Sequence, residues 1–244
     1  MSFNTKHQLD GTQTEHARRV REMFGGIARR YDLLNHVLSG NTDKRWRRLV
    51  AKRIAATLPP TGGLVLDVAC GTGDLSLAIQ RESGARVIGT DFCRPMLEIA
   101  ARKAHDIPLV EGDALRLPFA DQVFDAVSIA FGLRNLSSVE DGLTELRRVL
   151  KPGGHAAVLE FSTPVVPGMS GLFQLYFHRV LPRIGGMVSG SRAAYTYLPN
   201  SVVKFPDQGK LAEMMTTAGF TAVEYKNLTG GIAALHFGRR GTAD

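Results

Sequence analysis

The stretch Val65-Leu66-Asp67-Val68-Ala69-Cys70-Gly71-Thr72-Gly73-Asp74 decides the fold of this 244-residue chain. Its apolar start predicts a strand, its glycines predict a turn, and Asp74 opens a helix. Glycine has no Cβ, so a ligand can approach the backbone of such a turn closely. Asp91 ends the next predicted strand, where a carboxylate accepts hydrogen bonds from ribose hydroxyls. The pattern predicts a site for a nucleoside-containing cofactor.

Two other nucleotide-binding motifs start in a similar way. A dinucleotide fold of the NAD type has a third glycine, and Ser76 stands at that position here. A P-loop ends in Gly-Lys-Ser or Gly-Lys-Thr, which this stretch lacks. Both motifs are therefore disfavoured.

Outward from this stretch, strand and helix patterns alternate. Strands are predicted over residues 64–69, 86–90, 108–111, 123–130 and 155–161. Helices are predicted over residues 74–80, after Pro95, and over 139–150 and 207–218. Residues 221–225 and 232–237 are predicted as two last strands, paired as a hairpin. This order predicts an α/β fold: a mostly parallel seven-stranded sheet with helices on both faces.

The residues before Pro59 have helical patterns instead. Helices are predicted over 14–24 and 45–58, and the second is stopped by Pro59-Pro60. We expect residues 1–60 to form an N-terminal helical cap that belongs to the same domain. Residues 61–244 would form the main domain, with an apolar insertion at about 165–205.

The net charge of +7 is concentrated near the N-terminus. Between His16 and Arg53 the basic residues are Arg18, Arg19, Arg21, Arg29, Arg30, Lys44, Arg45, Arg47, Arg48, Lys52 and Arg53. Such a patch suits nucleic acid, an anionic membrane surface or an acidic substrate, and it is equally typical of a solvated helical face.

Several classes of protein are disfavoured by what the sequence lacks. Cys70 and Cys93 form no CxxC pair, and the seven histidines have no paired ligand spacing, so we expect no metal. The polar N-terminus is unlike a signal peptide, and no run approaches the ~18 apolar residues of a membrane span. A cytoplasmic protein is expected.

Residues 62–161 resemble class I methyltransferases that depend on S-adenosylmethionine (SAM). The resemblance implies a Rossmann-like fold and SAM as the cofactor. It assigns Asp67, Gly71, Thr72 and Gly73 to the methionine end, Asp91 to the ribose, and Asp113 and Ala114 to the adenine amino group.

A narrower resemblance rests on three further blocks: Tyr31-Asp32-Leu33-Leu34-Asn35, Phe131-Gly132-Leu133-Arg134-Asn135, and Arg148-Val149-Leu150-Lys151-Pro152-Gly153-Gly154. With several C-terminal stretches, they resemble the UbiE/MenG family of quinone C-methyltransferases over residues 24–238. Two positions depart from the family pattern. Asp43 replaces a usual histidine, and Ala130 replaces a frequent serine, which puts one polar contact to SAM in doubt.

The narrower resemblance implies methyl transfer to a ring carbon of a reduced polyprenyl quinone. The acceptor would be demethylmenaquinol, a polyprenyl methoxy-benzoquinol, or both. Arg134 would stabilise an oxyanion, Asn135 would hold a ring hydroxyl, and Tyr31 would close over the site with Asp32. Each also has a structural interpretation: Arg134 pairs with a carboxylate, Asn135 caps a turn, and Tyr31 is a core aromatic residue.

Residues 169–187 form an apolar segment that interrupts the alternating pattern. Helical spacing is typical of core packing. The family's substrate carries a polyprenyl tail, so the segment also suits a tail channel or weak peripheral contact with the bilayer.

Other functions stay open at this stage. One keeps SAM but takes another acceptor, such as a phospholipid amine or RNA, although no RNA-binding addition is visible and no nucleic acid is expected. Another is a non-catalytic SAM-binding subunit of a quinone-synthesis complex. The sequence leaves the oligomeric state open.

Overall fold

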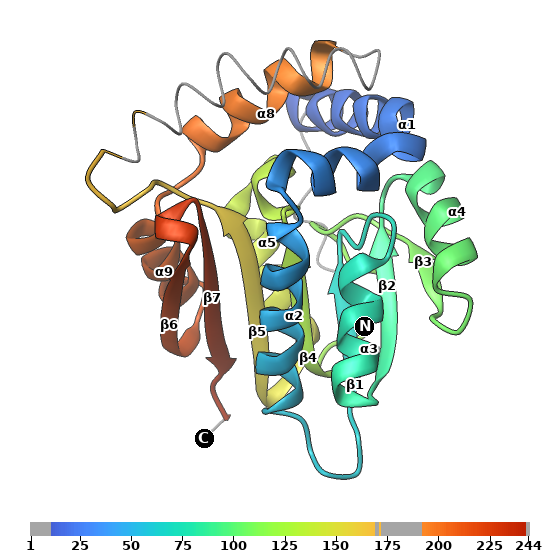
Figure 1. Ribbon diagram of the computed structural model, residues 1–244. Helices are drawn as coiled ribbons and strands as arrows, with labels where there is room; N and C mark the ends of the chain where they lie inside the picture. Colours follow the sequence, from blue (N-terminus) through green and yellow to red (C-terminus); the bar gives the residue numbers. More distant parts are fainter. Residues whose placement is uncertain (1–10, 169–170, 172–191, 243–244) are drawn as a thin grey trace.

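The computed structural model describes residues 11–168, 171 and 192–242 (Figure 1). Apart from Gly171, the apolar segment 169–187 lies outside the described residues. Within the described ranges, no helix is long and apolar enough to cross a membrane. The same ranges hold no group of three or more His, Cys, Asp or Glu residues placed to hold a metal ion.

A single sheet of seven strands forms the centre, in the order β3-β2-β1-β4-β5-β7-β6. The strands are β1 Leu64–Val68, β2 Arg86–Asp91, β3 Leu109–Glu111, β4 Phe124–Ala130, β5 Leu150–Phe161, β6 Phe220–Leu228 and β7 Ala233–Arg240. The first five pair in parallel, whereas β7 is antiparallel to both β5 and β6. The predicted seven-stranded, mostly parallel α/β fold is confirmed, including the last two paired strands, which the 3-10 turn η3 (Thr229–Gly231) connects.

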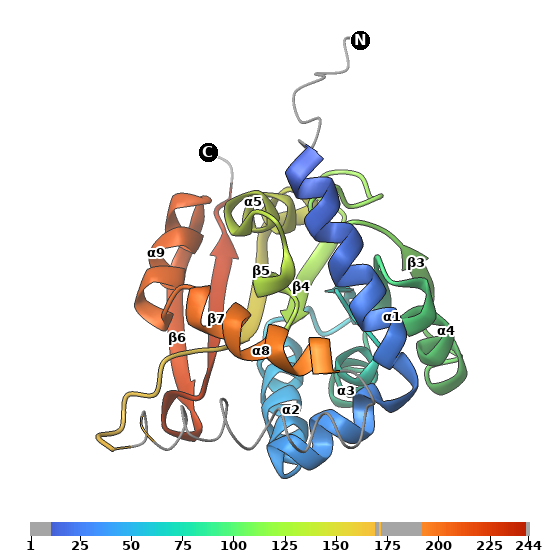
Figure 2. The same cartoon turned by 90° about the horizontal axis from the view of Figure 1, so that it is seen from above.

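Helices cover both faces of the sheet because successive strand side chains point to opposite sides. In β1, Val65 packs in one core with α2 (Thr42–Ala55) and α3 (Asp74–Ser83). Leu66 and Val68 pack in a second core with α5 (Val139–Val149) and α9 (Gln208–Thr217). Figure 2 shows α2 and α3 on one side of the sheet and α5 on the other. Strands buried on both faces are typical of parallel sheets.

Two helices lie across the carboxyl ends of the parallel strands: α1 (Gly11–Ser39) and α8 (Arg192–Lys204) (Figure 1, top). The prediction that the first helix ends at residue 24 was wrong, because α1 continues through Gly25-Gly26. A Cβ at Gly25 would stand 3.6 Å from Pro95 Cγ, an ordinary contact distance, so α1 packs at Gly25 against the start of α4 (Arg94–Lys103). Burial of Ala28 against Met96 offsets the helix cost of the glycines, about 1 kcal/mol each.

One strand also differs from its prediction. β5 begins at Leu150 rather than at residue 155, although Pro152-Gly153-Gly154 reads as a break. The pairing with β4 shifts register between Phe124 and Ala126, which marks a bulge opposite this stretch. Gly153 has φ +78°, so the bulge uses a backbone conformation that favours glycine.

Candidate active site

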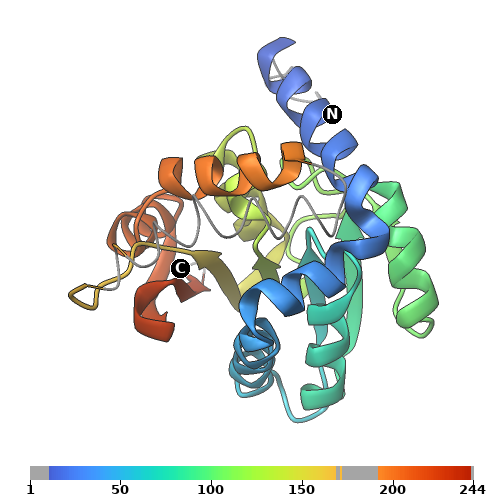
Figure 3. The ribbon, with the colours of Figure 1, turned by 45° about the horizontal axis from the view of Figure 1, so that its top comes forward.

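A hollow opens at the carboxyl ends of β1, β2 and β4, beneath α1. We call it the larger hollow. It is lined, among others, by Tyr31, Gly71, Asp91, Asp113, Ala130 and Asn135. A second, smaller hollow shares Tyr31, Gly71 and Ala130 with it and reaches Asp67 and Thr72. Figure 3 shows α1 and α8 bordering this edge of the sheet. The two hollows meet at the glycine turn, where open α/β sheets bind ligands.

Asp91 ends β2 and is almost fully buried, with 6% of the residue exposed. Its Oδ2 accepts the Gly71 N–H at 2.8 Å, and its Oδ1 accepts the Cys93 N–H at 2.8 Å. Burial raises the pKa of Asp91, and the backbone N–H groups of Cys93 and Gly71 oppose that rise. Each carboxylate oxygen keeps a lone pair, so the two oxygens can together accept two neighbouring hydroxyls.

The glycine turn presents backbone rather than side chains to both hollows. Gly71 has φ +56°, and a Cβ there would have only Tyr31 Cε1 as a neighbour, at 4.0 Å. Gly73 lines neither hollow. Its φ is +83°, and a Cβ there would stand 3.4 Å from Ala100 Cβ of α4. Gly71 therefore suits ligand approach, whereas Gly73 provides the left-handed backbone conformation at the N-cap of α3.

Asp67 lies in β1 at the floor of the smaller hollow and is 1% exposed. The Ser76 hydroxyl donates to Asp67 Oδ2 at 2.6 Å, and the Ser128 hydroxyl donates to Oδ1 at 2.8 Å. Burial raises the pKa of Asp67 to about 6, against the effect of these two hydrogen bonds. A buried carboxyl of this kind favours a cation close by.

The far end of the larger hollow is formed after β3. Asp113 Oδ1 accepts the Leu115 N–H at 2.9 Å, and Ala114 lines the hollow beside it. Asp113 Oδ2 has no hydrogen-bond partner among the described residues, so it can accept one from a ligand. Ala130 lines both hollows and offers no polar atom from its side chain.

These groups fit SAM. The larger hollow holds a paired acceptor for a ribose at Asp91 and an acceptor at Asp113, while the smaller hollow holds a buried carboxyl suited to an ammonium group. The cofactor residues expected from the sequence thus line these two adjoining hollows, except Gly73, which lines neither.

Tyr31 and Asn135 both line the larger hollow, one from α1 and the other from the 3-10 turn η1 (Leu133–Asn135). Asn135 Oδ1 accepts the Tyr197 hydroxyl of α8 at 3.2 Å, and Asn135 Nδ2 donates to Phe131 O at 3.1 Å. Its backbone oxygen lies 3.1 Å from His16 Nε2. Burial raises the pKa of Tyr31, and the nearby Arg134 charge opposes that rise.

Arg134 lines neither hollow and forms a buried ion pair behind η1. Its Nη1 lies 3.0 Å from Glu160 Oε2, with side-chain exposures of 6% and 1%. Glu160 Oε1 also accepts the Arg134 backbone N–H at 3.1 Å, and Arg134 Nη1 donates to Phe131 O at 2.5 Å. Arg134 Nε is buried without a hydrogen-bond partner among the described residues. The carboxylate partner that the structural interpretation of Arg134 requires is therefore Glu160.

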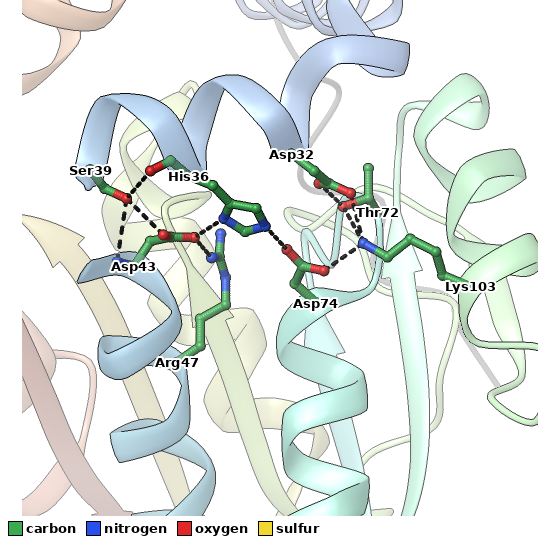
Figure 4. Close-up of polar contacts among 8 residues, drawn as sticks. All are labelled: Asp32, His36, Ser39, Asp43, Arg47, Thr72, Asp74 and Lys103. Carbon is green, nitrogen blue, oxygen red and sulfur yellow. Dashed lines mark hydrogen bonds and ion pairs between the residues drawn. The ribbon is translucent and has the colours of Figure 1, made fainter. Parts of the chain in front are cut away.

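A polar network that the sequence did not predict connects α1 and α2 to the glycine turn (Figure 4). Thr72 donates to Asp32 Oδ1 at 2.5 Å, and Lys103 Nζ lies 2.7 Å from Asp32 Oδ2 and 2.5 Å from Asp74 Oδ1. On the other side of Asp74, His36 approaches both that carboxylate and Asp43. Asp32, expected to close over the site, therefore ties α1 to the turn.

Arg47 is the site residue that sequence reasoning missed. It was grouped with the basic patch, yet it is buried and lines the smaller hollow. A signal was present: Arg47 lies four residues before Ala51 and three before Val50, on the apolar face of α2. Other patch residues do pair on the surface, such as Arg48 with Glu82 and Arg53 with Glu224.

Comparison with known sequences points to one family. Residues 12–240 match the sequence model of the ubiE/COQ5 methyltransferase family. The chain is 49% identical over 223 residues to a demethylmenaquinone methyltransferase of Thermus thermophilus, covering 89% of this chain and 100% of the relative. It is 47% identical to a demethylmenaquinone methyltransferase of Deinococcus radiodurans, covering 93% and 95%. It is 45% identical to a ubiquinone/menaquinone biosynthesis C-methyltransferase UbiE of a Geobacter species, covering 93% and 98%.

Solved structures share the fold at low sequence identity. The crystal structure of the [4+2]-cyclase SpnF has a TM-score of 0.68 at 20% identity, covering 93% of this chain and 97% of that one. A SAM-dependent methyltransferase of Thermotoga maritima, described as a possible histamine N-methyltransferase, has a TM-score of 0.61 at 18% identity, covering 90% and 98%. These likenesses show the fold.

Proposed function

Because the chain belongs to the ubiE/COQ5 methyltransferase family, we propose that it methylates a ring carbon of a demethylated polyprenyl naphthoquinol. The protein is a SAM-dependent C-methyltransferase of quinone biosynthesis, as its family and relatives are. The choice of a naphthoquinol over a benzoquinol is supported by the relatives in Thermus and Deinococcus, both named demethylmenaquinone methyltransferases.

The observation that carries the proposal is Asp91 in the larger hollow, bonded to Gly71, which lines both hollows. Both of its oxygens are fixed by backbone N–H groups, at Gly71 and Cys93, and each keeps a lone pair for a ribose hydroxyl. Around it we assign Asp67, Gly71 and Thr72 to the methionine end, and Asp113 and Ala114 to the adenine end. Ala130 leaves room in the site because its side chain is small. Gly73 shapes the site indirectly, through the geometry of the glycine turn.

We assign the acceptor side to Tyr31, Asn135 and Arg134. Tyr31 and Asn135 line the larger hollow directly. Arg134 belongs to η1 but lies outside both hollows, ion-paired with Glu160. Its charge opposes the rise that burial causes in the pKa of Tyr31 and of Tyr197, whereas Glu160 raises the pKa of Tyr197. We assign the guanidinium of this ion pair to stabilising negative charge that develops on an acceptor hydroxyl.

The chemistry needs positioning and charge control. When bound, SAM supplies an electrophilic methyl group. Transfer would join the ring carbon to that methyl carbon as the sulfur–methyl bond breaks, would release the neutral thioether, and would pass the ring-carbon proton to water. Asn135 holds a ring hydroxyl, and Tyr31 keeps the ring facing the glycine turn. Arg134 stabilises phenolate character in the acceptor, which makes the ring carbon more nucleophilic.

The test is transfer of label from methyl-labelled SAM to a short-chain demethylmenaquinol by the purified protein. We expect label in the naphthoquinol product and slower transfer to a methoxy-benzoquinol. SAM binding without transfer to either quinol would favour a non-catalytic subunit. Transfer only to a phospholipid amine or RNA would overturn the quinol assignment.

We also propose a cytoplasmic protein that makes weak, reversible contact with anionic membranes, where the polyprenyl tail holds the substrate. Lys44, Arg45 and Lys52 of α2 are exposed, and basic residues near an anionic surface contribute about 1 kcal/mol each. Co-sedimentation with anionic vesicles should fall as salt rises, because screening shortens the attraction. Absence of binding to anionic and neutral vesicles alike would contradict this contact.

A further inference from the structure

The smaller hollow contains an unusual set of charges for a site that takes a cationic cofactor. Asp67 and Asp74 line it, and so does the Arg47 guanidinium. Among the described residues, Arg47 is the only lysine or arginine that lines either hollow. Burying a cation in a cofactor site costs free energy unless an anion offsets it.

The Arg47 guanidinium is fixed through a single nitrogen, Nη1. Its side chain is 11% exposed, and its Nη1 donates to Asp43 Oδ2 from one helical turn earlier in α2. Within the described residues, Nη1 is the only nitrogen of the Arg47 guanidinium that makes a hydrogen bond. Nε and Nη2 make none among these residues, and they are not fully buried in protein. The Phe131 ring lies 5.9 Å from Arg47 Cζ. The remaining N–H donors are therefore available to a ligand in the hollow.

Asp43 is itself fixed from several sides (Figure 4). Besides Arg47, Ser39 Oγ donates to it at 2.7 Å, and His36 Nδ1 lies 2.9 Å from it. Burial acts to raise the pKa of Asp43, but Ser39 and Arg47 outweigh it and hold the pKa below its usual range. Asp43 therefore orients the guanidinium as an anion.

The methionine end of SAM carries an ammonium group and a carboxylate. Asp67 suits the ammonium, whereas the carboxylate needs a donor of opposite charge. We propose that Arg47, oriented by Asp43, binds the methionine carboxylate of SAM. This inference rests on the proposed function only in taking SAM as the cofactor. Arginine suits the task because its planar fork meets a carboxylate with parallel hydrogen bonds.

Selectivity for the carboxylate follows from this geometry. Decarboxylated SAM keeps the adenosine, the sulfonium and the amine, so it loses only the partner of Arg47. It would also leave the N–H donors of Arg47 that Asp43 does not engage without an acceptor from the ligand. The wild-type protein should therefore bind decarboxylated SAM more weakly than SAM, by roughly 10- to 100-fold.

The test measures the affinities of SAM and decarboxylated SAM by calorimetry and compares their ratio between variants. Arg47→Met should bring the ratio close to one, mainly by weakening SAM. Arg48→Met is the matched control, because Arg48 is exposed and pairs with Glu82. Its ratio should equal that of the wild type. Arg47→Lys keeps the charge but not the fork and should give an intermediate ratio.

Arg47→Met leaves Asp43 buried without its cation, which can unfold the protein. The double variant Asp43→Asn with Arg47→Met removes both charges together and should show the same ratio close to one. Equal wild-type affinity for the two ligands would overturn the proposal without any variant. So would an equal loss of both affinities in the arginine variants. A wild-type protein that binds neither ligand would instead refute the proposed function.

Discussion

The cofactor side and the acceptor side of the site are assembled differently. On the cofactor side, Asp91 is fixed by the N–H groups of Gly71 and Cys93, both within twenty residues of it. On the acceptor side, Asn135 bonds Tyr197, 62 residues away, and contacts His16, 119 residues away. Local backbone geometry builds the first, and long-range packing of α1 and α8 builds the second. We therefore expect acceptor-side changes to affect turnover and cofactor-side changes to affect SAM affinity.

Arg134→Ala should have the largest effect of the changes that test this difference between the two sides, and the effect should be on turnover. Removing a fixed charge that stabilises a developing anion typically costs about 10²- to 10³-fold in rate, so single-turnover transfer to the quinol should fall by that order. SAM affinity, measured by calorimetry, should stay at the wild-type value. A wild-type transfer rate would refute the catalytic assignment.

The control for this variant must allow for Glu160, because loss of its partner leaves a buried charge worth roughly 3–5 kcal/mol of stability. Arg134→Met combined with Glu160→Gln removes both charges, and its melting temperature should stay nearer that of the wild type. Turnover should still be lost. Recovery of turnover in the double variant would mean that Arg134 serves only to neutralise Glu160.

Asp91→Ala should have the next largest effect, this time on binding. Two charge-assisted hydrogen bonds of at least ~1.5 kcal/mol each correspond to a loss of about 100-fold in SAM affinity. Asp106→Ala is a matched control, since Asp106 has a side-chain exposure of 75% and lies outside both hollows. Unchanged affinity in calorimetry would remove Asp91 from the cofactor site.

The pH dependence of SAM affinity should show a smaller, graded effect. The pKa of Asp67 is raised to about 6 by burial, and a cationic ligand favours the ionised form. Below pH 6 the free protein must release a proton to bind, so affinity should fall by up to about tenfold per pH unit. Asp67→Asn should flatten this profile. If the SAM affinity of the wild type did not change between pH 5 and 7, Asp67 would not be a contact of the ligand's cation.

Asp67 should also make the stability of the unliganded protein depend on pH, but in the opposite direction to SAM affinity. A folded-state pKa above the unfolded value means that the folded state binds the proton more tightly. The contribution of Asp67 to the free energy of unfolding is therefore fully present below its unfolded-state pKa, and it is lost as the pH rises through about 6. Asp43, whose pKa is lowered, contributes above its unfolded pKa and loses that contribution as pH falls through its folded pKa.

The contrast between the two sides also explains what the sequence could predict. The glycine turn and Asp91 are local in sequence, so strand, turn and acid were recognisable together. The full length of α1 was missed because Gly25-Gly26 suggests a helix end, whereas packing against Pro95 of α4 allows the helix to continue. Arg47 was missed because a charge pattern alone does not distinguish a solvated arginine from one that Asp43 holds in a hollow.

Tyr197→Phe should give the smallest effect and the finest test of the acceptor side. It removes one neutral hydrogen bond, 3.2 Å long, from the Tyr197 hydroxyl to Asn135 Oδ1, worth about 0.5–1.5 kcal/mol. kcat/KM for the quinol should drop roughly two- to tenfold, with SAM affinity unchanged. Tyr225→Phe is the control, because Tyr225 is exposed on β6, far along the sheet from β1. If SAM affinity fell and quinol kinetics did not, α8 would support the cofactor side, and the division between the two sides would be wrong.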